Sequence, residues 1–116
     1  MNSESDEAIA VFVTAANSNE AVQLAEMLVN KRLAACVQIL PEIESIYSWR
    51  GKVERQREVL LIAKTMKFKF SDVESEVRAI HSYETPEIVA IPLTAGSPAY
   101  LEWLSASVSN PVQTPT

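Results

Sequence analysis

The chain has 116 residues, of which 47% are hydrophobic and 22% are charged, values typical of one soluble globular domain. Its formal net charge of −5 argues against nucleic-acid binding, because phosphate contacts need basic side chains. The single cysteine, Cys36, excludes an intrachain disulfide. No apolar stretch approaches the roughly 20 residues of a membrane span, and the acidic first residues do not resemble a secretory signal. We therefore expect a cytoplasmic protein without membrane contact, unless a targeting segment precedes this sequence.

The first part of the chain predicts a tail, a strand and a helix. Residues 1–7 are polar and acidic, which is typical of a disordered tail. Residues 8–15 are apolar on both faces, which predicts a central, fully buried strand. Asn17 followed by Glu20 is an N-cap pattern, and the apolar residues that follow at spacings of three and four predict a helix to about Asn30.

The next part of the chain predicts an unusually long β-hairpin. Residues 33–49 and 52–65 both read as strands, and only residues 49–52 between them read as a turn. Arms of about 15 residues would reach roughly 50 Å, whereas an ordinary strand has about 5–6 residues. Pro41 predicts a bulge where the hairpin leaves the domain body. The far end must project, and another chain must cover its unpaired edges.

The last part of the chain predicts two more helices and a strand. Apolar residues from Phe70 to Ile80 at helical spacing predict a helix that has ended by Thr85-Pro86. Residues 87–93 predict a strand, and Ser97-Pro98 begins a helix that reaches Val108. Residues 109–116 predict a flexible tail, so the single domain should span residues 8–108.

This order of elements predicts an α+β fold. With right-handed crossovers, strand, helix, strand, strand, helix and strand give a ferredoxin-like, four-stranded antiparallel sheet with two helices on one face and an additional C-terminal helix. The other face of the sheet is also apolar. Partner chains or the third helix must therefore bury it.

Several motifs resemble the CutA divalent-cation tolerance family. They occur in order at residues 31–37, 46–53, 64–65, 81–88 and 100–104. The resemblance implies a tight homotrimer with the hairpins in its interfaces, and an association with tolerance of copper and other divalent cations. We accordingly assign Tyr47, Trp49, Arg50 and Val53 to the trimer interface.

His81 is the only histidine and therefore the main candidate ligand for copper or another divalent cation. The alternative is a structural histidine at a helix C-terminus. In bacterial relatives for which copper ligation has been proposed, the set is a cysteine on the first strand and two adjacent histidines. Those positions here are Val13, Ile80 and His81, which argues against a high-affinity copper site. Glu84 and Glu87 are either weak oxygen ligands or solvated capping residues.

A ligand cleft is the competing hypothesis, with Lys64, Tyr83 and Cys36 as its candidate residues. Lys64 would pair with a carboxylate such as Glu87 or hold an anionic ligand. In this case the chain would be a signalling or scaffold trimer, resembling the PII proteins, that binds a small anion or a partner protein between subunits. No catalytic set of residues is visible, so we do not expect an enzyme.

Overall fold

The computed structural model describes residues 7–109 and confirms the ferredoxin-like α+β fold. The sheet has the strand order β2-β3-β1-β4, and neighbouring strands are antiparallel. In chain order the elements are β1 (Ala8–Ala15), α1 (Ser18–Asn30), β2 (Cys36–Trp49), β3 (Lys52–Met66), a 3-10 turn η2 (Lys67–Lys69), α2 (Phe70–Ile80), β4 (Ile88–Pro92) and α3 (Pro98–Ser107). The tails predicted for residues 1–7 and 109–116 lie almost entirely outside the described residues.

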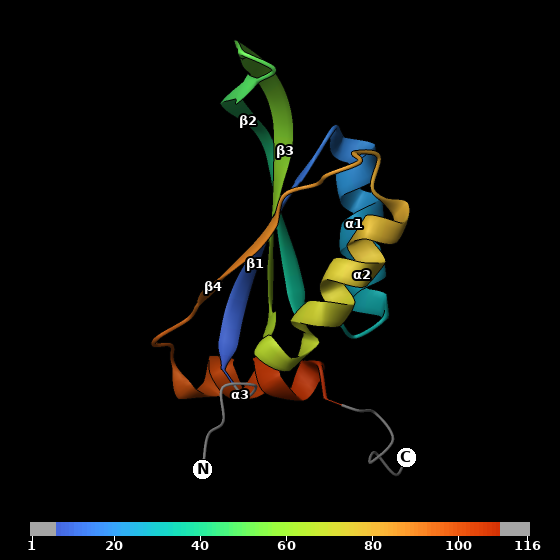
Figure 1. Ribbon diagram of the computed structural model, residues 1–116. Helices are drawn as coiled ribbons and strands as arrows, with labels where there is room; N and C mark the ends of the chain where they lie inside the picture. The colour runs from blue at the N-terminus through green and yellow to red at the C-terminus, as the bar shows by residue number, and fades with distance from the viewer. Residues whose placement is uncertain (1–6, 110–116) are drawn as a thin grey trace.

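The core lies between one face of the sheet and the helices α1 and α2, which cover the same face (Figure 1). As predicted, β1 is central, and its side chains toward these helices are buried. Leu24 and Leu28 of α1 and Val73 and Val77 of α2 are fully buried against this face. The helical spacing of apolar residues in α1 and α2 thus explains why both helices pack on this face of the sheet.

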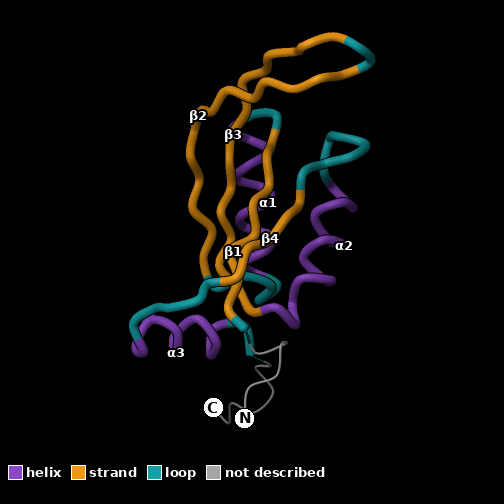
Figure 2. The backbone as a smooth tube through the Cα atoms, turned by 60° about the vertical axis from the view of Figure 1, so that its left-hand side comes forward, coloured by secondary structure: helices purple, strands orange, loops and turns teal. Residues whose placement is uncertain are grey.

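The opposite face of the sheet, here called the open face, has no helix layered on it. The strand registers place a set of apolar side chains there, namely Phe12, Leu40, Leu60, Ile62, Val89 and Ile91. Val89 and Ile91 on the edge strand β4 are about half exposed, at 52% and 50%. Helix α3 crosses the end of the sheet remote from the hairpin tip and packs there through Leu104 and Val108 (Figures 1 and 2). The third helix therefore leaves most of this face bare.

Strands β2 and β3 form the predicted long hairpin. Their pairing runs from Cys36 opposite Lys64 to Trp49 opposite Lys52. We call residues 36–40 and 59–66 the hairpin root, which pairs with the rest of the sheet, and residues 43–58 the outer hairpin. The outer hairpin extends past the last β1–β3 pair, Ala15 with Val59, and bends over (Figure 2). The radius of gyration is 15.4 Å, against about 13 Å for a compact domain of about 100 residues.

The hairpin turn and its bulge both follow from the local sequence. Arg50 and Gly51 have positive φ values of 52° and 81°, as a two-residue turn of the type I′ class requires. The register shifts between Leu40 and Ile43, so Pro41 and Glu42 together oppose Val59. The bulge predicted at Pro41 is confirmed, and it marks where the hairpin leaves the domain body.

The predicted strand boundaries hold to within one residue except at the start of β2. Strand β2 begins at Cys36, three residues later than expected. Arg32 adopts a left-handed φ of 58°, and the amides of Leu33 and Ala34 both donate to the carbonyl of Leu28. These residues close the C-terminus of α1 instead of joining the sheet, because the helix leaves carbonyls that need donors.

Candidate functional site

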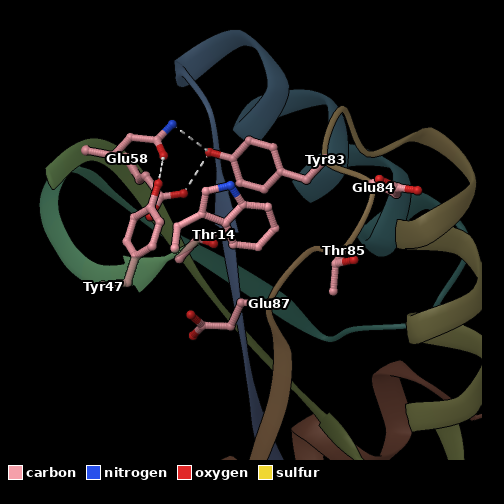
Figure 3. Close-up of a pocket in the computed structure, with 9 residues that line it drawn as sticks. Thr14, Tyr47, Glu58, Tyr83, Glu84, Thr85 and Glu87 are labelled. Carbon is pink, nitrogen blue, oxygen red and sulfur yellow. Dashed lines mark hydrogen bonds between the residues drawn. The ribbon is translucent and has the colours of Figure 1, made fainter. Parts of the chain in front are cut away.

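A pocket of about 450 Å³ lies between the outer hairpin and the loop that follows α2. The residues that line it are Thr14, Tyr47, Trp49, Gln56, Glu58, Tyr83, Glu84, Thr85 and Glu87. Thr14 is the last residue but one of β1, and residues 83–87 belong to the loop that connects α2 to β4, so three separate segments meet here (Figure 3). The outer hairpin bends (Figure 2) and contributes Tyr47 to the same pocket as this loop. The pocket therefore exists only because the hairpin is long.

Glu58 is the central polar residue of the pocket. Its carboxylate is nearly buried, since the residue is 8% exposed. It accepts hydrogen bonds from the Ser45 hydroxyl at 2.6 Å and from the Tyr83 hydroxyl at 2.7 Å. Tyr47 donates to Gln56 at 2.8 Å, and Gln56 in turn donates to the Tyr83 oxygen at 3.4 Å (Figure 3). This network joins the two strands of the outer hairpin to the loop after α2.

The network keeps the Tyr83 hydroxyl protonated. Burial of the phenol raises the pKa of Tyr83 well above its ordinary value of 10, and the hydrogen bond to Glu58 and the charge of that carboxylate raise it further. Tyr83 is therefore a hydrogen-bond donor at any physiological pH. It holds one oxygen of Glu58 in a fixed position.

The loop that carries Tyr83 is held in place by His81 and Glu20. The side chain of His81 is 0% exposed. Its Nε2 lies 2.7 Å from the carbonyl oxygen of Thr14, and its Nδ1 lies 3.0 Å from the amide nitrogen of Tyr83. An amide N–H only donates, so Nδ1 accepts and Nε2 carries the proton that goes to Thr14.

Glu20 anchors the same loop from the start of α1. Its carboxylate accepts from the Ala16 amide at 2.9 Å and from the Ser82 amide at 2.6 Å. Burial alone would raise the pKa of Glu20, but the hydrogen bonds from Ala16 and Ser82 outweigh that effect and lower it. Asn17 caps α1 as predicted, and its side chain accepts from the Glu20 amide. The predicted capping pattern thus also fastens the loop that follows α2.

This geometry leaves His81 without a free nitrogen for a metal. Both ring nitrogens are engaged, and the ring is buried. Residues 7–109 contain no group of three or more His, Cys, Asp or Glu side chains arranged to hold a metal ion. His81 has the position expected of the structural alternative, at the C-cap of α2.

Glu84 and Glu87 both line the pocket, but they lie on different sides of it. Figure 3 shows their carboxylates pointing away from each other. Neither forms a salt bridge or a side-chain hydrogen bond with another described residue. Each is available to a cation only as a single carboxylate, which is a weak ligand.

Lys64 and Cys36 lie far from this pocket, at the other end of the hairpin. They are paired opposite each other in β2 and β3. Lys64 donates to Gln38 at 2.8 Å, and the Cys36 sulfur lies 3.6 Å from the Tyr100 hydroxyl of α3. The expected pairing of Lys64 with Glu87 is wrong. Lys64 pairs with Ala10 in β1, whereas Glu87 directly precedes Ile88, which pairs with Val13 near the other end of β1. The structure therefore separates Tyr83 from the other two residues of the predicted cleft.

The residues assigned to a trimer interface all lie at the end of the outer hairpin. In the single chain Val53 is 79% exposed and Trp49 is 57% exposed, and Arg50 lies over the Trp49 ring at 5.4 Å. Sequence reasoning missed Glu58, Gln56 and Glu20 as site residues. A signal for Glu58 was present, because it is the last polar residue before the apolar half of β3.

Comparison with known proteins places the chain in a family. The profile of the CutA1 divalent ion tolerance protein family matches residues 9–107. The chain is 46% identical over 102 residues to the chloroplastic protein CutA of Arabidopsis thaliana, covering 88% of this chain and 56% of that protein. It is 44% identical over 94 residues to the divalent-cation tolerance protein CutA of Thermus thermophilus, covering 81% and 91%.

Solved structures agree with these sequence matches. The structure of the periplasmic divalent cation tolerance protein CutA from Archaeoglobus fulgidus superposes with a TM-score of 0.86 at 41% identity, covering 88% of this chain and 99% of that one. The chain spans little more than half of some curated relatives, 56% of the Arabidopsis protein and 59% of the mouse protein CutA. None of the helices within residues 7–109 is long and apolar enough to cross a membrane. With the family profile spanning nearly the whole described domain, the chain belongs to the family of CutA1 divalent ion tolerance proteins.

Proposed function

We propose that the chain forms a homotrimer that supports tolerance of divalent cations, copper among them, and that it acts by binding and not by catalysis. The names of its relatives support the link to divalent cations. We also propose a cytoplasmic location, although relatives carry names that refer to the chloroplast and the periplasm.

The observation that carries the assembly is the open face of the sheet. Val89 and Ile91 are about half exposed there on the edge strand β4, and Leu40, at 40%, lies on the opposite edge strand β2. An exposed, contiguous apolar surface of this kind marks an interaction site in a stable protein. The outer hairpin adds a second exposed apolar set at Trp49 and Val53, which lies beyond the reach of the chain's own core. Two further copies of the chain would bury both surfaces at once.

A charge placed on the open face tests this assembly. Ile91→Glu should convert the trimer to smaller species, because three carboxylates would have to be buried. Val22→Glu is the matched control, since Val22 is similarly exposed, at 44%, but lies on α1. Sedimentation should show dissociation for Ile91→Glu alone. Equal masses for both variants would contradict the proposed interface.

We further propose that any direct contact with a divalent cation is weak and uses carboxylate oxygens at the pocket, not His81. The engaged nitrogens of His81 support this choice, as do the unpaired carboxylates of Glu84 and Glu87. Copper and zinc titrations of folded His81→Ala should match the parent protein, whereas Glu84→Gln combined with Glu87→Gln should weaken binding. Loss of copper binding in His81→Ala alone would restore the histidine as the ligand.

A second candidate function is a small-ligand-binding trimer that resembles the PII proteins. The pocket favours it, because a cavity of about 450 Å³ lined by aromatic and a few polar groups is typical of small-molecule sites. The lining residues contain no lysine or arginine, so they do not support the anionic ligand that the sequence suggested. A thermal-shift panel of anionic and cationic metabolites would show which charge of ligand the protein binds. No shift with any compound would count against this function.

A further inference from the structure

Glu58 carries a charge that nothing in the described chain neutralises. The residue is 8% exposed, and its two hydrogen-bond donors, Ser45 and Tyr83, are both neutral hydroxyls. No lysine, arginine or histidine among residues 7–109 forms an ion pair with it. Burial of an ionised carboxylate without a cation is costly, so such groups are normally paired. A cation from outside the chain could fill this role.

The other residues that line the pocket also favour a cation. Its lining contains the further carboxylates of Glu84 and Glu87 and no basic side chain. Two arginines of the outer hairpin pair with other carboxylates, Arg55 with Glu44 and Arg57 with Glu42. The negative charge of the lining disfavours anions and favours a positively charged ligand.

The aromatic side chains narrow the class of cation. Tyr47, Trp49 and Tyr83 line the pocket, and aromatic faces attract ammonium groups but offer a metal ion no strong ligand. Arg50 already lies over the Trp49 ring at 5.4 Å, which shows that this indole accepts a cation. Each oxygen of Glu58 accepts one hydroxyl hydrogen and retains a lone pair for an N–H donor.

We propose that the pocket binds a small primary alkylammonium ion, with the ammonium group at Glu58 and the alkyl part against Tyr47, Trp49 and Tyr83. The inference rests on the second candidate function and names its ligand class. The ammonium group neutralises the buried carboxylate, and the aromatic rings remove the alkyl chain from water. Tyr83 positions Glu58 by its hydrogen bond and does not need to contact the ligand nitrogen.

Calorimetric titration of the full chain with n-butylammonium chloride tests the proposal. The two matched probes are 1-butanol, which has similar size and no charge, and sodium butyrate, which has the opposite charge. We expect saturable binding of the ammonium ion with a Kd on the order of 1 mM or tighter, and at least tenfold weaker binding of both controls. Equal binding of 1-butanol, or no saturation by the ammonium ion, would overturn the proposal.

Three variants locate the site. Glu58→Gln and Trp49→Leu should each weaken n-butylammonium binding at least tenfold, and Glu26→Gln, a matched change on an exposed face of α1, should not. If Glu58→Gln fails to fold, Trp49→Leu decides, provided that light scattering gives it the same mass as the parent protein, because Trp49 is 57% exposed in the single chain and its replacement leaves the core of the chain intact. Unchanged binding in the folded pocket variants would place the ligand elsewhere and refute the assignment.

Light scattering on the same samples separates this inference from the proposed assembly. A trimer that ignores n-butylammonium would refute the ligand class and leave the assembly unaffected. Such a result would be expected if the hairpin of a second copy fills the pocket. A monomer that binds the ammonium ion would refute the assembly and retain the ligand class, since a single chain supplies every lining residue.

Discussion

The hairpin root and the outer hairpin belong to the same two strands but obtain their stability differently. In the root, Leu61 and Ala63 are fully buried against α1 and α2. In the outer hairpin, Val53 is 79% exposed, and polar side chains around Glu58 provide the cross-strand contacts. The change occurs at the bulge opposite Val59. The domain thus folds around the root, and the outer hairpin is available for binding.

The largest expected effect is in the root. Leu61→Ala removes a fully buried side chain and leaves a cavity between β3 and the helices. It should lower the free energy of unfolding by about 2–5 kcal/mol, measured by urea denaturation at fixed protein concentration. Val53→Ala is the control in the outer hairpin. Equal losses for the two variants would remove the distinction between the regions.

The next effect lies in the network that joins the two regions. Tyr83→Phe removes the hydroxyl that donates to Glu58, and it should cost about 1.5–3 kcal/mol because the acceptor is a charged, buried group. The raised pKa of Tyr83 gives a second readout. Unfolded tyrosine loses its proton near pH 10 while the folded one retains it, so stability should fall as the pH rises above 10.

Tyr83→Phe should remove the part of this alkaline loss that belongs to the phenol. An identical decline above pH 10 in the parent and the variant would show that Tyr83 is not the titrating group. Hydrogen exchange of the outer-hairpin amides should also increase in the variant, because the loop no longer holds Glu58.

A smaller effect is expected at the anchor of the loop. Glu20→Gln should cost about 1–2 kcal/mol at neutral pH, because the amides of Ala16 and Ser82 lose a charged acceptor. The pKa of Glu20 is lowered from 4.5, so its stabilising contribution is complete above pH 4.5 and falls as the pH drops through the folded value. Acid unfolding curves of Glu20→Gln should therefore be flatter below pH 4.5, and a parallel curve would contradict the assignment.

The smallest effect is at the turn. Arg50→Gly removes the strain of a non-glycine residue in the left-handed region, which should stabilise the fold by roughly 1–2 kcal/mol. It also removes the cation–π contact with Trp49, which should destabilise the fold by about 0.5–1 kcal/mol. Added backbone entropy in the unfolded chain offsets part of the gain. The net change in unfolding free energy should stay below about 1 kcal/mol. A loss of several kcal/mol would mean that Arg50 makes further contacts, as expected if it lies in a subunit interface.

Most of the fold could be predicted from the sequence because the patterns are local. The apolar run of residues 8–15, the helical spacing of α1 and α2, and Pro41 each act through their own neighbours in the chain. The error at the start of β2 arose because a local pattern was followed where a contact with the preceding helix decides the structure. Leu33 and Ala34 look like strand residues, but their amides complete the C-terminus of α1.

The site was less predictable because it depends on contacts between distant segments. Glu58 faces Tyr83 across 25 positions of sequence, and Glu20 reaches Ser82 across 62. The sequence left His81 as either a metal ligand or a structural histidine at a helix C-terminus, because its contact with the Thr14 carbonyl follows from no local pattern. Lys64 and Glu87 have opposite charges, but the strand register keeps them apart.

The mass of the protein in solution tests the central claim most directly, namely that the outer hairpin and the open face are covered by two further copies of the chain. Sedimentation equilibrium over a dilution series to micromolar concentration should give three times the 12.8 kDa of one chain. A mass of 12.8 kDa at micromolar concentration would contradict the account, because the apolar residues of both surfaces would then remain exposed to water.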